Sequence, residues 1–221
     1  MTISPSRRLT SKQKLDLNNM NAASQRAGGL GDRLDSMQYD GVPVVSVGTV
    51  SAMKVISYSI TPALASTTGV HAAITLPTSG TTVVTTGITN PDFPRQITIT
   101  GNAAGITGTV SLVGTDINDA ALSEDLTAVD NTTVTSTKAF KTITSITVPT
   151  RTTAGDTISV GTGAKVGLPV AVPQTTLVLI KNFNGATDSG TVTAGATAAL
   201  SVYAAAGTFD GAKILQLIFL A

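Results

Sequence analysis

The chain has 221 residues, a formal net charge of +1 at pH 7 and no cysteine, and only 12% of its residues are charged. This length suits one large β domain or two small ones. The lack of cysteine excludes disulfides, thiolate zinc sites and cysteine nucleophiles. A net charge this close to zero gives no long-range attraction for nucleic acid or for an anionic membrane.

Composition favours strands over helices. The chain holds 38 Thr and 21 Gly, and aromatic residues make up 4%. Thr fits strands and Gly fits tight turns, while both weaken helix interiors. The low charge and a mean hydropathy of +0.29 indicate that part of the surface is buried in an assembly. The first residues lack the apolar middle of a secretory signal, so we expect synthesis in the cytoplasm.

Residues 1–40 differ from the rest and predict an extended, partly helical N-terminal arm. Ser11 can cap a short helix that runs to about Ala27, where Gly28 gives a stop signal. Four Asp residues partly offset the positive charge of this arm. Its six basic residues are the candidate partner-binding residues: Arg7, Arg8, Lys12, Lys14, Arg26 and Arg33.

From residue 41 onward, short apolar runs are separated by Gly, Pro, Asn and Asp, which is typical of many strands linked by turns. In the run at 54–60, Ile56, Tyr58 and Ile60 alternate with serines, so one face can be buried. The even spacing predicts an all-β fold with a β-sandwich or jelly-roll-like body over residues 41–221. A subdivision near residues 61–70 is left open. The predicted strands fall within 42–50, 54–60, 71–76, 81–86, 95–100, 108–114, 141–148, 156–161, 175–181, 190–195, 199–204 and 213–220.

The last of these runs has apolar residues on both faces. Leu215, Leu217 and Phe219 lie on one face of a strand, and Ile214, Ile218 and Leu220 on the other. We therefore expect a strand that is covered on both sides, within the core or at a subunit interface.

Few motifs in the sequence indicate a catalytic or ligand-binding site. His71 is the one histidine and has no Cys or second His to share a metal, so a packed or surface imidazole is expected. The acidic stretch from Asp116 to Asp130 has oxygen ligands that could bind calcium, but its spacing does not match an EF-hand loop. A solvated turn or an interface with basic residues is the favoured reading. The glycines from Gly161 to Gly167 do not match a phosphate-binding loop and predict a β-turn region.

A resemblance covers roughly residues 93–221. The run PRQITITGNAAGITGTVSLVGTDINDAALSEDL, then KAFKTITSITVP and GTGAKVGLPV, and the ending GTFDGAKILQLIFL resemble β-rich virion structural proteins of tailed bacteriophages. The resemblance implies a non-enzymatic late protein of the virion. It also implies that catalytic residues, cofactors and metals have no part in its role.

Among virion positions, capsid decoration or a head fibre fits best, because the chain has no long spine helix of the major capsid type. The expected partner is the major capsid protein on the outer capsid surface, with a symmetric homo-oligomer, a trimer being favoured by analogy. Neither a membrane nor a specific nucleic acid is expected as a partner. The alternatives are a tail-tube or baseplate subunit, a host- or carbohydrate-binding module, and a hydrolase that uses carboxylates between Asp116 and Asp130.

Overall fold

The computed structural model describes residues 38–39, 42–43 and 54–220. The chain divides into two compact units, Met1–Ala52 and Met53–Ala221. In the first unit, two short strands, β1 (Gln38–Tyr39) and β2 (Val42–Pro43), pair antiparallel. The expected helix from Ser11 and the six basic residues of the arm lie outside the described residues.

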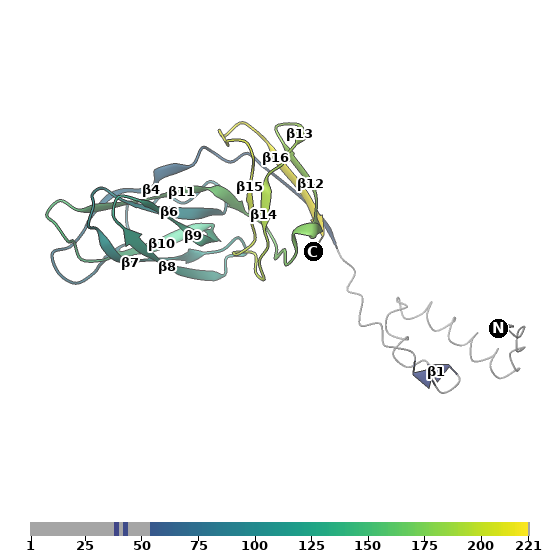
Figure 1. The fold of residues 1–221 in the computed structure, drawn as a ribbon, viewed down its shortest axis with the longest axis horizontal. Coiled ribbons are helices and arrows are strands. Elements are labelled where there is room, and N and C mark those ends of the chain that lie inside the picture. The colour runs from purple at the N-terminus through teal and green to yellow at the C-terminus, as the bar shows by residue number, and fades with distance from the viewer. Residues whose placement is uncertain (1–37, 40–41, 44–53, 221) are drawn as a thin grey trace, which may run out of the picture. The chain divides into compact units, whose positions relative to one another are not determined.

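The second unit is all-β and sandwich-like, as the sequence predicts (Figure 1). One layer, which we call the β7 sheet, has the strand order β5 (Thr82–Val84), β10 (Thr142–Val148), β7 (Thr107–Thr115) and β8 (Ala121–Val129). The facing layer, the β11 sheet, has the order β14 (Thr191–Thr193), β15 (Val202–Ala204), β11 (Thr157–Gly167), β6 (Arg95–Gly101) and β9 (Thr133–Phe140), and β4 (Ser66–Thr75) also pairs with β11.

A third, four-stranded sheet lies at the end of the unit where β14 and β15 are found (Figure 1). This β16 sheet has the order β13 (Ala186–Thr187), β12 (Val178–Phe183), β16 (Leu215–Leu220) and β3 (Val55–Ile60). A 3₁₀ turn, η2 (Thr175–Leu177), precedes β12. Within the described ranges, no helix is long and apolar enough to cross a membrane.

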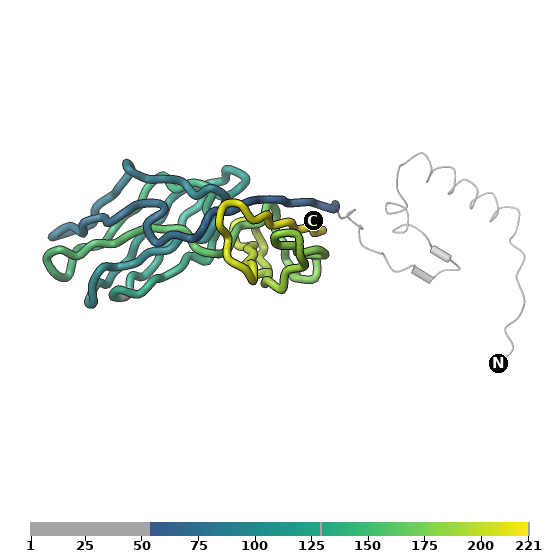
Figure 2. The backbone as a smooth tube through the Cα atoms, turned by 90° about the horizontal axis from the view of Figure 1, so that it is seen from above, coloured from purple at the N-terminus to yellow at the C-terminus, as the bar shows by residue number. Residues whose placement is uncertain are grey.

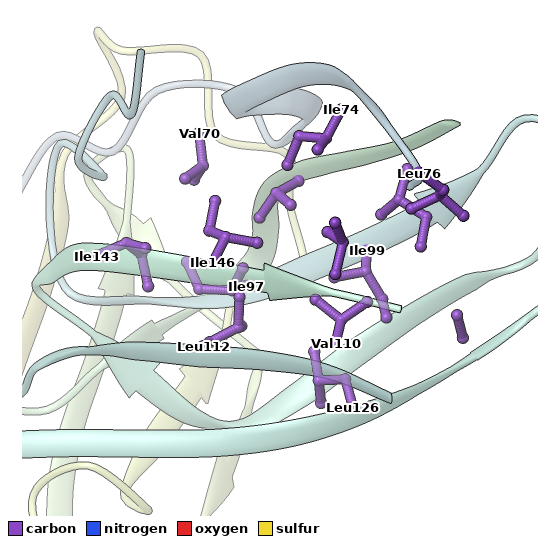
Figure 3. Close-up of a cluster of buried hydrophobic side chains, with 14 of the residues drawn as sticks. Val70, Ile74, Leu76, Ile97, Ile99, Val110, Leu112, Leu126, Ile143 and Ile146 are labelled. Carbon is purple, nitrogen blue, oxygen red and sulfur yellow. The ribbon is translucent and has the colours of Figure 1, made fainter. Parts of the chain in front are cut away.

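The unit has two hydrophobic cores. Figure 2 shows the backbone of the unit, in which the segment that includes β14, β15 and β16 lies at one end. The first fills the space between the β7 and β11 sheets, where branched side chains from both layers meet (Figure 3). The second lies between the β16 sheet and the adjoining end of the β11 sheet, and it includes Tyr203 and Phe209. Strand β11 serves both cores, since Ile158 and Val160 belong to the first and Val166 to the second.

Period-two alternation explains most of these strands. In β6, Ile97 and Ile99 are buried in the first core, while Gln96 and Thr98 lie on the opposite face. In β3, the alternation of exposed serines with Ile56, Tyr58 and Ile60 is confirmed. These patterns are local, which is why the sequence reveals them.

Three expectations need correction. Residues 161–167 are not a β-turn region but the second half of strand β11. The acidic stretch is not only a turn, because residues 121–129 form strand β8. Strand β16 is fully buried on one face only: on the other, Ile218 and Leu220 are half-buried, and Ile214, just before the strand, is 45% exposed.

Candidate functional site

The predicted acidic stretch does not gather its carboxylates into one site. Asp116 accepts hydrogen bonds from the backbone amides of Asn118 and Ala120, and so closes the turn between β7 and β8. Asp119, with a positive φ of 62°, pairs with Lys141 at 2.7 Å. Asp130, also at positive φ, accepts from the amide of Gly105 at 2.7 Å. Each of these carboxylates serves its own turn.

Glu124 has a different task because it lies on strand β8. Its carboxylate accepts hydrogen bonds from the amide and hydroxyl of Thr137 at 2.7 and 2.8 Å, and from the amide of Lys138 at 3.0 Å. Strands β8 and β9 are edge strands of the two facing sheets. Glu124 thus satisfies donors on the edge of β9 and ties the two layers together.

The neighbouring Asp125 points away and is exposed. Among the described residues, no three Asp, Glu or His side chains lie close enough to hold a metal ion. The acidic stretch therefore provides hydrogen bonds at turns and at the edge of a sheet.

His71 lies on β4 and is half-buried, with its Nδ1 2.6 Å from the carbonyl oxygen of Ala72. Its other ring nitrogen faces Gly87. This position matches the packed or surface imidazole that the sequence favours, and no carboxylate hydrogen-bonds to it in the described part of the chain.

The most deeply buried charged side chain in the described part of the chain is an arginine. Arg95 is 1% exposed, and its guanidinium donates to the carbonyl oxygens of Gly163 and Ala63 at 3.0 and 2.8 Å. It also pairs with Asp92 at 3.3 Å and lies over the ring of Phe209, 5.9 Å from its centroid. Burial lowers the pKa of Arg95, and Asp92 opposes that shift.

Two tyrosines in the second core have contrasting environments. The hydroxyl of Tyr58 is buried without a hydrogen-bond partner, and burial followed by the charge of Asp92 raises the pKa of Tyr58 to about 12. The hydroxyl of Tyr203 donates to Asp188 at 2.6 Å. Burial and this hydrogen bond raise the pKa of Tyr203 well above its usual range.

An open cleft of about 300 Å³ lies on the face of the β11 sheet that is turned away from the first core. The start of β4 contributes Ser66 and Thr67 to the lining, β6 contributes Gln96 and Thr98, and β9 contributes Thr135. The Thr162–Lys165 part of β11 completes the lining.

Glycine at position 161 makes this cleft. Gly161 is the register partner of Thr98, so the two share a face of the sheet. A Cβ at Gly161 would collide with the backbone of Ser66 and Thr67. Because Gly has no side chain, the start of β4 can cross over this face and bound the cleft.

Three polar side chains of the cleft are more than nine-tenths buried: Gln96 and Thr98 are 7% exposed and Thr162 is 8% exposed. Thr162 accepts from the amide of Ser66 at 3.2 Å, and Gln96 makes a long contact of 3.4 Å to the carbonyl oxygen of Thr137. The hydroxyl of Thr98 has no partner. Lys165, which also lines the cleft, is in none of the ion pairs of the described residues.

Sequence reasoning missed both this cleft and the buried Arg95. The alternation of polar Gln96 and Thr98 with Ile97 and Ile99 was readable as a strand with one polar face. This alternation does not indicate that the polar face of β6 is covered, because the segment that covers it is brought there by the tertiary fold.

Comparisons with protein-family models, with curated proteins and with solved structures found no match to this chain. The class that the fold itself defines is an all-β, sandwich-like protein.

Proposed function

We propose that this protein is a non-enzymatic structural component of a tailed-phage virion, which binds the major capsid protein on the outer capsid surface as a decoration protein. The proposal starts from the resemblance over roughly residues 93–221. Cofactors, membranes and specific nucleic acids have no part in this role. The tail tube or baseplate is the alternative position within the same class.

The observation that carries the proposal is an uncharged outer face on the β16 sheet. Exposed Val55 pairs with Leu220, and exposed Ile180 pairs with Ile218, so these four residues share one face and form what we call the end-sheet patch. The register fills the rest of this face with polar, uncharged residues: Ser57, Ser59, Asn182 and Gln216.

Protein interfaces are depleted of charge at their centre, and large apolar side chains that cluster on a surface favour a protein partner. Of the seven large hydrophobic residues exposed in the described part of the chain, four belong to this sheet or adjoin it: Val55, Leu179, Ile180 and Ile214. We assign the end-sheet patch to contact between copies, as in a closed trimer.

The basic arm then provides the capsid contact. Its residues Arg7, Arg8, Lys12 and Lys14 are close in sequence and suit an acidic surface on the capsid shell. A protein that binds the assembled shell and not its free subunits stabilises the shell by mass action.

The test uses mature capsids from which accessory proteins have been stripped. Intact protein should bind them saturably, and a variant that lacks residues 1–40 should not. Replacing the four basic residues at positions 7, 8, 12 and 14 with Gln should weaken binding at least tenfold, whereas Lys54→Gln, outside the arm, should not. Failure of intact protein to bind, together with its recovery in isolated tails, would place it in the tail instead.

A further inference from the structure

We propose that Asn184 is a site of spontaneous deamidation, and that its main product, isoaspartate, opens the hairpin between β12 and β13. The reaction uses water and hydroxide as its co-reactants and needs no enzyme. This inference concerns the covalent chemistry of the β body and does not depend on the capsid role.

The turn between β12 and β13 has the two residues that this chemistry requires. Asn184 and Gly185 form the whole loop of the hairpin, since Phe183 pairs with Ala186. They are also the one Asn-Gly step in the sequence. Deamidation begins when the backbone nitrogen of the following residue attacks the Asn side chain. Glycine has no Cβ, so it leaves this nitrogen open to the approach.

Both reacting groups are accessible. Asn184 and Gly185 are exposed. Among the described residues, neither the side-chain amide of Asn184 nor the backbone amide of Gly185 makes a hydrogen bond. The contact that holds Asn184 is its own backbone amide, which donates to the carbonyl oxygen of Ile214 at 2.8 Å. Neither reacting group therefore has to leave a partner before the reaction.

The hairpin can open locally to let the two groups meet. Asn184 and Gly185 have positive φ angles of 52° and 80°, as in a type I′ turn. The backbone at Asn184 must rotate to bring the Gly185 nitrogen to the side-chain carbon, so the turn has to open. Strand β13 has two residues, both exposed, at the edge of the β16 sheet. A strand this short and exposed opens at low cost in free energy.

The reaction balances with water alone. Hydroxide removes the amide proton of Gly185, and the nitrogen attacks Cγ of Asn184. The new N–C bond closes a five-membered succinimide, and the Cγ–Nδ2 bond breaks. Water returns a proton to Nδ2, which leaves as ammonia, and the hydroxide is regenerated. A second water then opens the ring at either carbonyl, which gives aspartate or isoaspartate.

Other asparagines of the described unit lack this combination. Asn90 precedes Pro91, whose nitrogen has no proton to lose. The side chain of Asn102 is held on both sides: it donates to the carbonyl oxygen of Gly155 at 3.1 Å and accepts from the amide of Thr157 at 2.8 Å. Asn102 is therefore an internal reference for Asn184.

Isoaspartate changes the hairpin because its main chain runs through the former side chain and is longer by a carbon atom. A two-residue loop depends on its exact backbone geometry, so the longer loop cannot keep the type I′ turn. The pairing of Asn182 with Thr187 should weaken. The hydrogen bond from the amide of Asp188 to the carbonyl oxygen of Lys181, 2.8 Å long, should weaken with it.

The test is incubation of the full-length protein at about pH 8.5, followed by peptide mapping. Cleavage after Lys181 and Lys213 releases one peptide that carries Asn182 and Asn184, and fragmentation distinguishes them. We expect a mass gain of about 1 Da at Asn184, mostly as isoaspartate, and none at Asn102. The rate should fall several-fold at about pH 6.5, because less hydroxide is present.

Matched variants separate the longer main chain from the new charge. Asn184→Gly accepts positive φ and has no side chain to react. In the deamidated wild type, the amide of Asp188 should exchange at least about tenfold faster than in fresh protein, whereas Asn184→Gly should not change on incubation. Fresh Asn184→Asp, which has the charge without the longer main chain, should exchange at Asp188 like the wild type.

Three outcomes would overturn the proposal. If folded protein gains no mass at Asn184 while a peptide of residues 181–187 reacts under the same conditions, the hairpin protects the site. If Asn102 reacts as fast as Asn184, the turn does not select the site. If exchange at Asp188 is unchanged in the deamidated protein, the modification does not open the hairpin.

Discussion

At the scale of single residues, buried Tyr203 of the second core and partly buried Tyr58, which packs against that core, differ in one hydrogen bond. Tyr203 donates to Asp188, which also accepts from the amide of Ala206 at 3.2 Å. Tyr58 has no partner for its hydroxyl. Since an unsatisfied buried group is destabilising and a satisfied one is not, the same substitution should act in opposite directions at the two positions.

We predict that Tyr203→Phe lowers the free energy of unfolding by about 1–3 kcal/mol, because Asp188 loses a buried donor. Tyr58→Phe should leave it unchanged or raise it by about 0.5–1 kcal/mol, because the hydroxyl that is removed has no partner. Urea unfolding of both variants at pH 7 measures the difference. Equal destabilisation by the two would show that Tyr58 has a partner in solution.

The raised pKa of Tyr58 gives a pH dependence with a definite sign. The pKa is about 12 in the folded protein against an ordinary value of 10.0, so the folded state keeps a proton that the unfolded state loses above pH 10. This contribution to stability is fully present below pH 10 and is lost as the pH rises toward 12. By pH 11 the loss is about 1 kcal/mol.

The expected result is that the wild type loses about 1 kcal/mol more than Tyr58→Phe between pH 9 and pH 11. Urea midpoints at both pH values give this comparison, and absorbance at 295 nm follows tyrosine ionisation. Tyr203 is present in both proteins, so its own raised pKa cancels. If the free energies of unfolding of the two proteins changed equally between pH 9 and pH 11, the raised pKa of Tyr58 would be contradicted.

At the scale of elements, strand β8 shows how two adjacent acidic residues take different roles. Glu124 faces β9 and accepts three hydrogen bonds from Thr137 and Lys138, whereas Asp125 faces solvent. Strand β8 pairs with β7 without interruption from Thr107–Val129 to Thr115–Ala121. This register keeps Glu124 and Asp125 on opposite faces of β8.

We predict that Glu124→Ala lowers the free energy of unfolding by about 1–3 kcal/mol, because two backbone amides on the edge of β9 lose a charged acceptor. Asp125→Ala should change it by less than about 0.5 kcal/mol. Urea unfolding gives both values, and amide exchange should show faster exchange at Thr137 and Lys138 in the first variant alone. Protection of those two amides in Glu124→Ala would refute the edge contact.

At the scale of the whole molecule, strand β11 links the two cores. Its first half packs in the first core through Ile158 and Val160, and its second half packs in the second core through Val166. A substitution that destabilises one core should therefore also destabilise the other. We expect residues 53–221 to unfold as one cooperative unit.

Leu217→Ala tests this coupling, since Leu217 is fully buried in the second core. We expect a loss of about 2–4 kcal/mol in a single transition. Near-UV circular dichroism follows the buried tyrosines of the second core, and amide exchange follows β7 and β10 in the first. Persistent protection of β7 and β10 after the tyrosine signal is lost would instead mean that the cores unfold separately.

The proposed oligomer makes a further prediction at this scale. Replacing Val55 and Ile180 with Glu should give a folded monomer, because both side chains are exposed in a single copy, at 63% and 42%. Its urea midpoint should equal that of the wild type at protein concentrations where the wild type has also dissociated. Val83→Glu is the control, because Val83 is also exposed but lies on the β7 sheet. Sedimentation velocity over a range of concentrations measures the state of each, and a wild type that stays monomeric throughout would contradict the assignment.

The sequence by itself determined the all-β class and most strands, because these follow from local alternation, as in Ile97 and Ile99 of β6, and from turn residues between the runs. For β16 it predicted that both faces are covered, and the structure shows one fully buried face. It failed at β8, where Glu124 and Asp125 interrupt the apolar pattern although Leu122 and Leu126 keep a period of two.

Only the tertiary structure determines which strand faces are covered by other segments of the chain. The segment that includes Ser66 lies about 30 residues before β6 in the sequence and crosses the sheet over Gly161. The burial of Arg95 and Thr98 and the formation of the cleft depend on this segment. The placement of Glu124 against Thr137 likewise depends on two sheets facing each other. Contacts of this kind join residues distant in sequence, so no local pattern of the chain carries them.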